Sequence, residues 1–174
     1  MNRHGGEEAV RSAVKKLRER IPGITLRSTV IVGFPGETEE DFEALCEFIK
    51  ETEFDRLGAF PYSPEEGTPA ATFEDQIDEQ VKIDRADIIM QTQYSIMEKK
   101  NEAMIGKTIR VLVEDFDPVS EMHFGRGDAD APEIDGKVYF SARRRIAPGS
   151  IVSVKIEDVL DYDLCGKALL FPEA

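Results

Sequence analysis

The chain has 174 residues, enough for one ordinary domain or two small ones. With 22 basic and 35 acidic residues its formal charge is −13, which disfavours free nucleic acid as a partner of the bulk surface and favours a basic protein. Two isolated cysteines, Cys46 and Cys165, form no CxxC or CxxxCxxC pattern, so no cysteine-ligated metal site is predicted. No apolar run reaches the roughly 20 residues that span a bilayer, and the start lacks a signal peptide, so we expect a soluble, cytoplasmic protein without membrane contact.

The first 62 residues predict alternating helices and strands. Apolar residues recur every three or four positions over 7–20, which indicates a helix, and the run ITLRSTVIV at 24–32 predicts a strand buried on both faces. Thr38, with Asp41 three residues later, predicts a capping box that opens a second helix. The run LGAFPY at 57–62 predicts a second strand. Two strands joined through a helix are typical of an α/β fold.

A turn-rich loop, SPEEGTPAATFEDQ, follows the second strand and leads into a long helix. The helix is predicted from about 78 to 104, with Gly106 as its stop signal. Two neighbouring apolar stripes on it are expected to pack into a core. One stripe is Val81, Ile88, Thr92 and Ile96, and the other is Ala86, Met90, Tyr94 and Met97.

From residue 107 the pattern changes to short segments of alternating apolar and polar residues, separated by Asp, Pro and Gly. Such segments predict a small all-β unit, here an OB-like barrel. Five strands are predicted, at 107–114, 121–126, 136–141, 150–158 and 162–170. We therefore expect two domains, 1–104 with a net charge of −9 and 105–174 with a net charge of −4.

The stretch VIVGFPGETEEDF places two glycines, a proline and a glutamate where the first strand ends. Ligands of α/β proteins bind at the carboxyl ends of strands, and Gly33 would let a flat ligand approach the backbone there. Pro35 and Gly36 predict a tight turn that leaves Glu37 at the opening of this expected ligand site, where it could accept hydrogen bonds from a ribose, an amine or a backbone N–H. The alternative is a plain strand-to-helix turn, with Glu37 favoured by the helix dipole.

Residues 60–63, FPYS, end the second strand. A right-handed crossover would bring them beside Gly33. One glycine-rich and one aromatic strand end together suit a nucleoside-like ligand.

Longer segments carry a family resemblance. VGFPGETEEDF, followed by FDRLGAFPYSPEEGTPAA, resembles the second half of the barrel of the radical SAM methylthiotransferases, and the tail resembles a TRAM domain. Two features favour the ribosomal-protein branch (RimO type) over the transfer-RNA branch (MiaB type). They are the pair Glu65-Glu66 and the segment GRGDADAPEIDGKVYF. The implied fold is a partial radical SAM TIM-like barrel, an α/β structure, followed by a small all-β TRAM barrel.

The resemblance implies an activity: transfer of a methylthio group to the β-carbon of an aspartate on the twelfth protein of the small ribosomal subunit. The family uses S-adenosylmethionine and two 4Fe–4S clusters, one held by a CxxxCxxC loop and the other in an N-terminal domain. Neither set of cysteines is in this sequence, and MNRHG resembles an internal family segment. We therefore expect a C-terminal portion that is inactive alone, with no catalytic residue and no metal ligand of its own.

The family match also implies binding residues at the two strand ends. S-adenosylmethionine is expected to contact Gly33, Phe34, Pro35, Gly36, Glu37, Phe60, Tyr62 and Ser63. Arg27, a charge within an apolar strand, is expected to face a carboxylate of the ligand or substrate, with an exposed strand start as the alternative. Six acidic residues are expected to contact the basic ribosomal protein: Glu65, Glu66, Asp128, Asp130, Glu133 and Asp135. For Glu65 and Glu66 the alternative is that they are simply solvated.

The sequence gives little support for RNA binding. Within the predicted barrel, Arg143, Arg144 and Arg145 form the only basic cluster, so RNA contact is expected to be weak or absent. His4 and His123 have no ligand-spaced partners and are interpreted as non-catalytic. Two other interpretations stay open: part of a tRNA methylthiotransferase, and a non-catalytic TRAM module that binds ribosomal protein or RNA.

Overall fold

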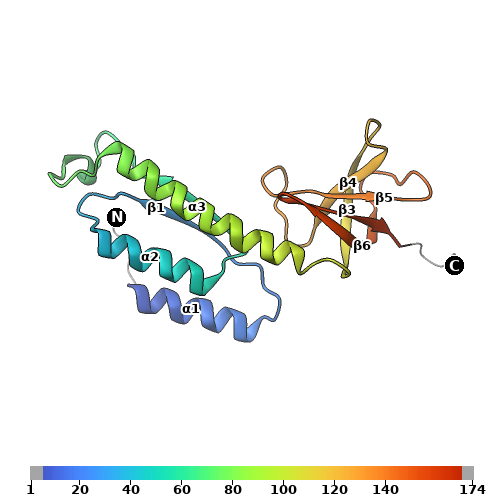
Figure 1. Ribbon diagram of the computed structural model, residues 1–174, viewed down its shortest axis with the longest axis horizontal. Coiled ribbons are helices and arrows are strands. Elements are labelled where there is room, and N and C mark those ends of the chain that lie inside the picture. Colours follow the sequence, from blue (N-terminus) through green and yellow to red (C-terminus); the bar gives the residue numbers. More distant parts are fainter. Residues whose placement is uncertain (1–5, 170–174) are drawn as a thin grey trace. The chain divides into compact units, whose positions relative to one another are not determined.

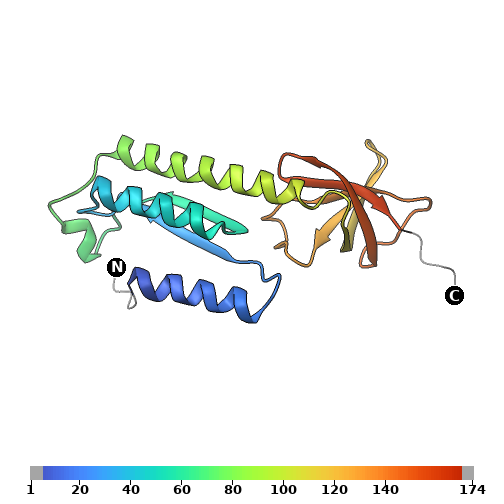
Figure 2. The same ribbon diagram turned by 60° about the horizontal axis from the view of Figure 1, so that its bottom comes forward.

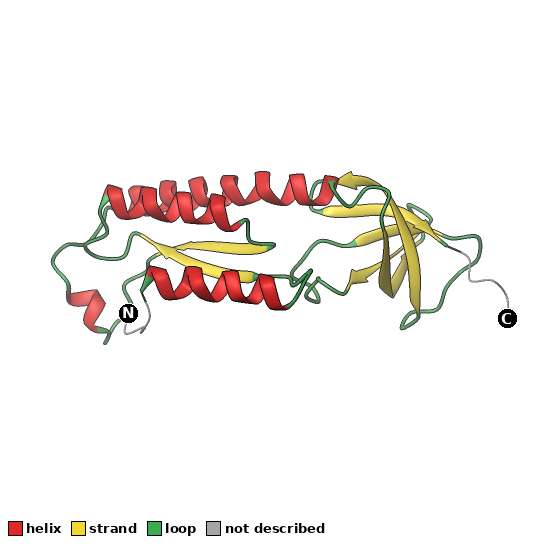
Figure 3. Ribbon diagram, turned by 90° about the horizontal axis from the view of Figure 1, so that it is seen from below, coloured by secondary structure: helices red, strands yellow, loops and turns green. Residues whose placement is uncertain are grey.

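The computed structural model describes residues 6–169, which divide into two compact units between Ile96 and Met97. His4 and the end of the predicted strand 162–170 lie outside the described residues. Figure 3 shows helices and strands mixed in the first unit and strands alone after the last helix. The elements are α1 (Glu7–Arg20), β1 (Arg27–Val32), α2 (Glu39–Thr52), β2 (Arg56–Pro61), η1 (Pro69–Thr72), α3 (Glu79–Glu102), β3 (Thr108–Asp117), β4 (Met122–Gly127), β5 (Val138–Ser141), β6 (Ile151–Leu160) and β7 (Asp163–Ala168).

The first unit is an α/β structure, as predicted. Strands β1 and β2 pair in parallel, with Arg27 opposite Arg56 and Val32 opposite Pro61. One face of this pair, including Val32 and Leu57, packs with α2 and α3 into the core. Helix α2 lies between α1 and α3 in both Figure 1 and Figure 2. Helix α1 buries no side chain fully, so the core depends on α2, α3 and the two strands.

The predicted stripes on α3 are partly wrong. Val81, Ile88 and Met90 are exposed, although Ala86, Ile96 and Met97 are buried as expected. The buried residues of α3 also include four polar ones, Lys82, Arg85, Gln93 and Asn101. Because polar side chains make up half of the buried residues, apolar periodicity could not locate that face.

The second unit is the predicted five-stranded barrel. Its strands close in the order β3-β4-β5-β7-β6, with β5 and β7 parallel and the other pairs antiparallel. Alternate residues point inward, so Val111, Val113, Val138, Phe140 and Val154 are almost completely buried. A stripe of inward-facing residues on each strand is what fills a small barrel.

His123, on β4, is buried in the barrel between two rings. Its imidazole stacks on Phe140 at 5.4 Å between ring centroids and meets the edge of Phe116 at 4.9 Å. Nε2 accepts a hydrogen bond from the backbone N–H of Ile146 at 2.9 Å, while buried Nδ1 has no hydrogen-bond partner. Burial, and then the nearby Arg145, lower the pKa of His123, so the neutral ring is favoured.

No helix within residues 6–169 combines the length and apolarity needed to cross a bilayer.

Acidification is expected to destabilise the barrel through His123. The folded pKa lies below the ordinary value of 6.5, so this contribution is fully present above that pH and is lost as the pH falls. Urea unfolding can be followed by NMR signals of the barrel at about pH 7.5 and about pH 5.5. Between these two pH values the free energy of unfolding should fall more for the wild type than for His123→Gln. Equal losses in the two proteins would contradict this assignment.

Candidate functional site

The carboxyl ends of β1 and β2 lie side by side, as the sequence predicted. The backbone N–H of Tyr62 donates to the carbonyl of Val32 at 2.8 Å, which continues the pairing just past the strands. The chain then turns between Phe34 and Glu37, where the Glu37 N–H donates to the Phe34 carbonyl at 2.9 Å and Gly36 has a φ of +82°. The predicted capping box between Thr38 and Asp41 is confirmed and starts α2 directly after this turn.

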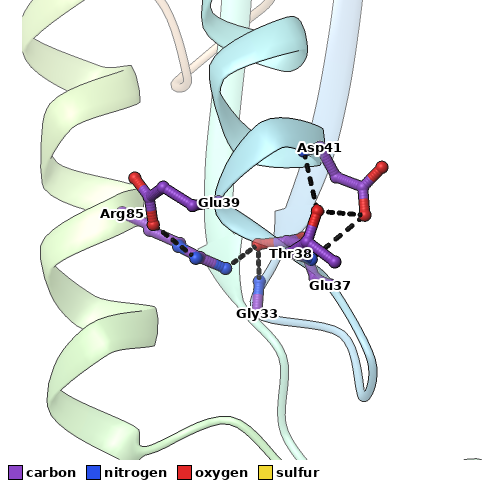
Figure 4. Close-up of polar contacts among 6 residues, drawn as sticks. All are labelled: Gly33, Glu37, Thr38, Glu39, Asp41 and Arg85. Atoms are coloured by element: carbon purple, nitrogen blue, oxygen red, sulfur yellow. Dashed lines mark hydrogen bonds and ion pairs between the residues drawn. The ribbon is translucent and has the colours of Figure 1, made fainter.

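The carboxylate of Glu37 connects this turn to α3 (Figure 4). Its Oε1 atom accepts one hydrogen bond from the Gly33 N–H at 2.9 Å and another from Arg85 Nη1 at 2.6 Å. Arg85 also donates to Glu39 at 2.8 Å, and its side chain is only 8% exposed. Burial alone would lower the pKa of Arg85, but the hydrogen bonds to Glu39 and Glu37 raise it overall, so the guanidinium stays charged.

Lys82 lies one turn before Arg85 on α3 and fills the space beside Gly33. A Cβ built on Gly33 would lie 2.3 Å from Lys82 Cγ, and Gly33 has a φ of +72°. The Lys82 ammonium pairs with Glu79 at 3.0 Å and lies 5.5 Å from the centre of the Tyr62 ring. The missing side chain of Gly33 therefore makes room for Lys82 on this side.

A pocket of about 680 Å³ lies on the other face of the strand pair. Four aromatic side chains line it, namely Phe34, Phe60, Tyr62 and Phe73, together with Thr29 and Ile31 of β1. The ring of Phe34 meets the edges of Tyr62 and Phe73 at centroid distances of 5.1 and 6.3 Å. Phe60 is 58% exposed, so one aromatic wall remains open to the exterior. The hydroxyl of Tyr62 is buried and makes no hydrogen bond.

The predicted cofactor residues fall into two groups. Phe34, Phe60, Tyr62 and Ser63 line the pocket, and Glu65, predicted for the substrate, lines it too. The other four do not line it and instead form the turn that carries Phe34; they are Gly33, Pro35, Gly36 and Glu37. Direct contact of this second group with a ligand stays a prediction.

Several residues of the site were missed by sequence reasoning. Phe73 follows a turn-rich loop, and nothing in its local pattern indicated that it returns to the strand ends. Thr29 and Ile31 could have been found, since they alternate with the core-facing residues of β1. Lys82 and Arg85 carried no signal, because charged residues on a long helix are usually solvated.

The residues predicted to bind the protein substrate are spread over both units. Arg27 is exposed at the amino end of β1, which agrees with the alternative of an exposed strand start. Glu65 and Glu66 are exposed in the loop after β2. Their roles, and that of Arg27, stay predictions.

Three acidic residues of the barrel hold their own loop together. Asp128 pairs with Arg110 at 2.9 Å, while Asp130 and Asp135 accept hydrogen bonds from the N–H groups of Gly127 and Ala131 at 3.0 and 2.7 Å. Glu133 is exposed, with a φ of +61°. These side chains shape the segment between β4 and β5, whatever else they bind.

Residues 6–169 do not fit an iron–sulfur cluster. No group of three or more His, Cys, Asp or Glu side chains in this range could hold a metal ion. Burial raises the pKa of Cys46, and burial with Asp158 and Asp163 raises that of Cys165. Both thiols are therefore protonated at neutral pH, whereas clusters are held by thiolates.

Comparison with known proteins gives two results. Residues 105–169 match the TRAM domain family. Nearly the whole chain is similar to proteins named ribosomal protein uS12 methylthiotransferase RimO. It is 46% identical to the protein of Desulfitobacterium hafniense and 46% identical to that of Trichlorobacter lovleyi, covering 97% of this chain and 38% of each relative. It is 47% identical to that of Klebsiella pneumoniae, covering 95% of this chain and 37% of the relative. The chain thus spans less than two-fifths of the length of these curated relatives.

Alanine at Gly33 is expected to destabilise the first unit more than alanine at Gly36. Both positions have positive φ, which costs an alanine roughly 1–2 kcal/mol, but only at Gly33 does the new Cβ collide with Lys82. At Gly36 no atom lies within 4 Å of that position. Urea unfolding should therefore show the larger loss for Gly33→Ala, and adding Lys82→Ala should recover part of the difference. The steric explanation fails if the two single variants lose equal stability.

Proposed function

This chain belongs to the family of RimO-type ribosomal-protein methylthiotransferases, and from that premise we propose that it is the C-terminal portion of such an enzyme. The complete enzyme would transfer a methylthio group to the β-carbon of an aspartate on ribosomal protein uS12, using radical SAM chemistry. Identity of about 46% along 97% of the chain supports this assignment. The TRAM match over residues 105–169 agrees with it.

The pocket at the strand ends is proposed to bind the adenosyl part of S-adenosylmethionine. Its volume of about 680 Å³ lies within the usual range for small-molecule sites, and its aromatic walls suit a flat purine. A polar ligand atom would also satisfy the buried hydroxyl of Tyr62. The four aromatic residues at adjacent strand ends are the observation that carries this proposal.

Each part of the pocket has its own role in this proposal. S-adenosylmethionine, when bound, supplies the groups for the carbon–sulfur chemistry. Phe34 and Phe73, which meet edge to face, would form one wall against which the base packs and would exclude water from it, while exposed Phe60 would close over it. Glu65 would provide an acceptor for a ligand hydroxyl or amine at the rim of the pocket.

The protein substrate is proposed to be recognised by charge. The chain carries a net charge of −13, and ribosomal protein uS12, the substrate named for the relatives, is expected to be strongly basic. Glu66 beside the pocket and Glu133 on the barrel are both exposed and could steer such a partner. Binding of this kind weakens steeply as salt is added.

The isolated chain is expected to lack methylthiotransferase activity, because residues 6–169 cannot hold a cluster. The test incubates the chain with a reductant, S-adenosylmethionine and ribosomal protein uS12, and weighs uS12 by mass spectrometry. No mass gain is expected. A methylthio adduct that depends on the chain would contradict this part of the proposal.

Truncating an aromatic wall is expected to weaken adenosyl binding. Stacking of one base on an aromatic ring is worth about 1–3 kcal/mol, so Phe73→Ala should raise the Kd for S-adenosylhomocysteine roughly 5- to 150-fold in an NMR titration. Phe124→Ala is the matched control, because Phe124 is a half-buried ring in the barrel. If Phe73→Ala binds as tightly as wild type, the adenosyl group is not held in this pocket.

A further inference from the structure

We propose that Arg85 is a positioning residue, which sets the shape of the pocket through Glu37 without touching the ligand. Arg85 does not line the pocket, and it lies 48 positions along the chain from Glu37. The identity of the ligand rests on the proposed function, but the positioning role itself rests on the contacts within this chain.

The first step is the sharing of one carboxylate oxygen. Glu37 Oε1 accepts from both Gly33 N–H and Arg85 Nη1, as drawn in Figure 4. The Glu37 side chain is only 13% exposed, so water contributes little to its solvation. A carboxylate that is largely removed from water needs a cationic partner to offset its lost solvation, and Arg85 is that partner.

The second step is the turn. The Glu37 N–H closes it from one side by donating to Phe34, and the Glu37 carboxylate closes it from the other by accepting from Gly33. Neither bond belongs to the strand pair or to a helix. The Gly36 N–H also donates to the Asp75 carbonyl at 2.9 Å, so the turn has a second anchor on the loop before α3. The Gly33 end of the turn depends on where the Glu37 carboxylate is held, and Arg85 holds it.

The third step is the pocket wall. Phe34 is carried by this turn, and its ring packs against Tyr62 and Phe73. A shift of Glu37 would move the Phe34 backbone and separate these rings. Lys82 supports the same region from the α3 side through Gly33 and the Tyr62 ring. Two cations one turn apart on α3 thus support both strand ends.

The chain offers a matched control for a merely structural role. Like Arg85, Arg11 bridges two glutamates, here Glu7 and Glu51, although its side chain is more exposed, at 37%. Each arginine also lies over a phenylalanine ring, Arg11 over Phe48 at 4.9 Å and Arg85 over Phe42 at 5.1 Å. Arg11 belongs to the same unit but does not line the pocket. Arg11→Met therefore removes the same kinds of contact as Arg85→Met and leaves the pocket unchanged.

The experiment compares wild type with Arg85→Met, Arg85→Lys and Arg11→Met. Hydrogen exchange of the Gly33 amide, measured by NMR, should accelerate about tenfold or more in Arg85→Met, while the Tyr62 amide stays protected. The Kd for S-adenosylhomocysteine should rise about tenfold or more. Arg85→Lys keeps the charge and should restore part of the Gly33 protection and part of the affinity. Arg11→Met should change neither the exchange of the Gly33 amide nor the Kd.

Unchanged exchange at Gly33 in Arg85→Met would overturn the inference, as would equal effects in Arg85→Met and Arg11→Met. If Arg85→Met does not fold, Arg85→Lys decides. A single ammonium cannot contact Glu37 and Glu39 with the geometry of the two guanidinium nitrogens, so partly accelerated exchange at Gly33 is expected, and wild-type exchange would overturn the inference. If wild type itself fails to bind S-adenosylhomocysteine, the proposed function fails. The exchange of the Gly33 amide still decides the role of Arg85 in that case.

Discussion

The first unit depends on one buried ionic contact, the carboxylate of Glu37 shared between the Gly33 amide and Arg85. A charge that is taken out of water costs free energy unless its partner is close and well oriented. Here the partner comes from a helix far along the chain, so the contact forms only when β1, α2 and α3 are all in place. The contact therefore couples the turn after β1 to the packing of the whole unit.

Local patterns predicted much of the fold. The capping box at Thr38 and Asp41 and the alternating strands of the barrel involve neighbouring residues, so the sequence displays them directly. The adjacency of Gly33 and Tyr62 followed from the handedness of a crossover. The polar part of the buried face of α3 could not be predicted, because Lys82 and Arg85 are buried only by virtue of distant strand ends.

The candidate site, too, combines features that the sequence predicted with features that it did not. Phe34, Phe60 and Tyr62 were predicted from the family resemblance together with their place at the strand ends, and they do line a pocket. The glycine-rich turn was predicted as a surface for a ligand, yet its hydrogen bonds and close contacts are largely with its own chain. Glycine and glutamate at a strand end are compatible with ligand binding and with packing of the turn against its own chain. Either use requires a position without a side chain and a carboxylate held in place.

The strand order of the barrel also determines when it can form during synthesis. Strand β7, near the end of the described chain, connects β6 to β5 and so completes the ring. Until β7 leaves the ribosome, β5 and β6 each present an unpaired edge. The first unit, whose strands are joined through a single helix, needs only earlier residues. Nascent chains should therefore acquire the α/β unit co-translationally and close the barrel last.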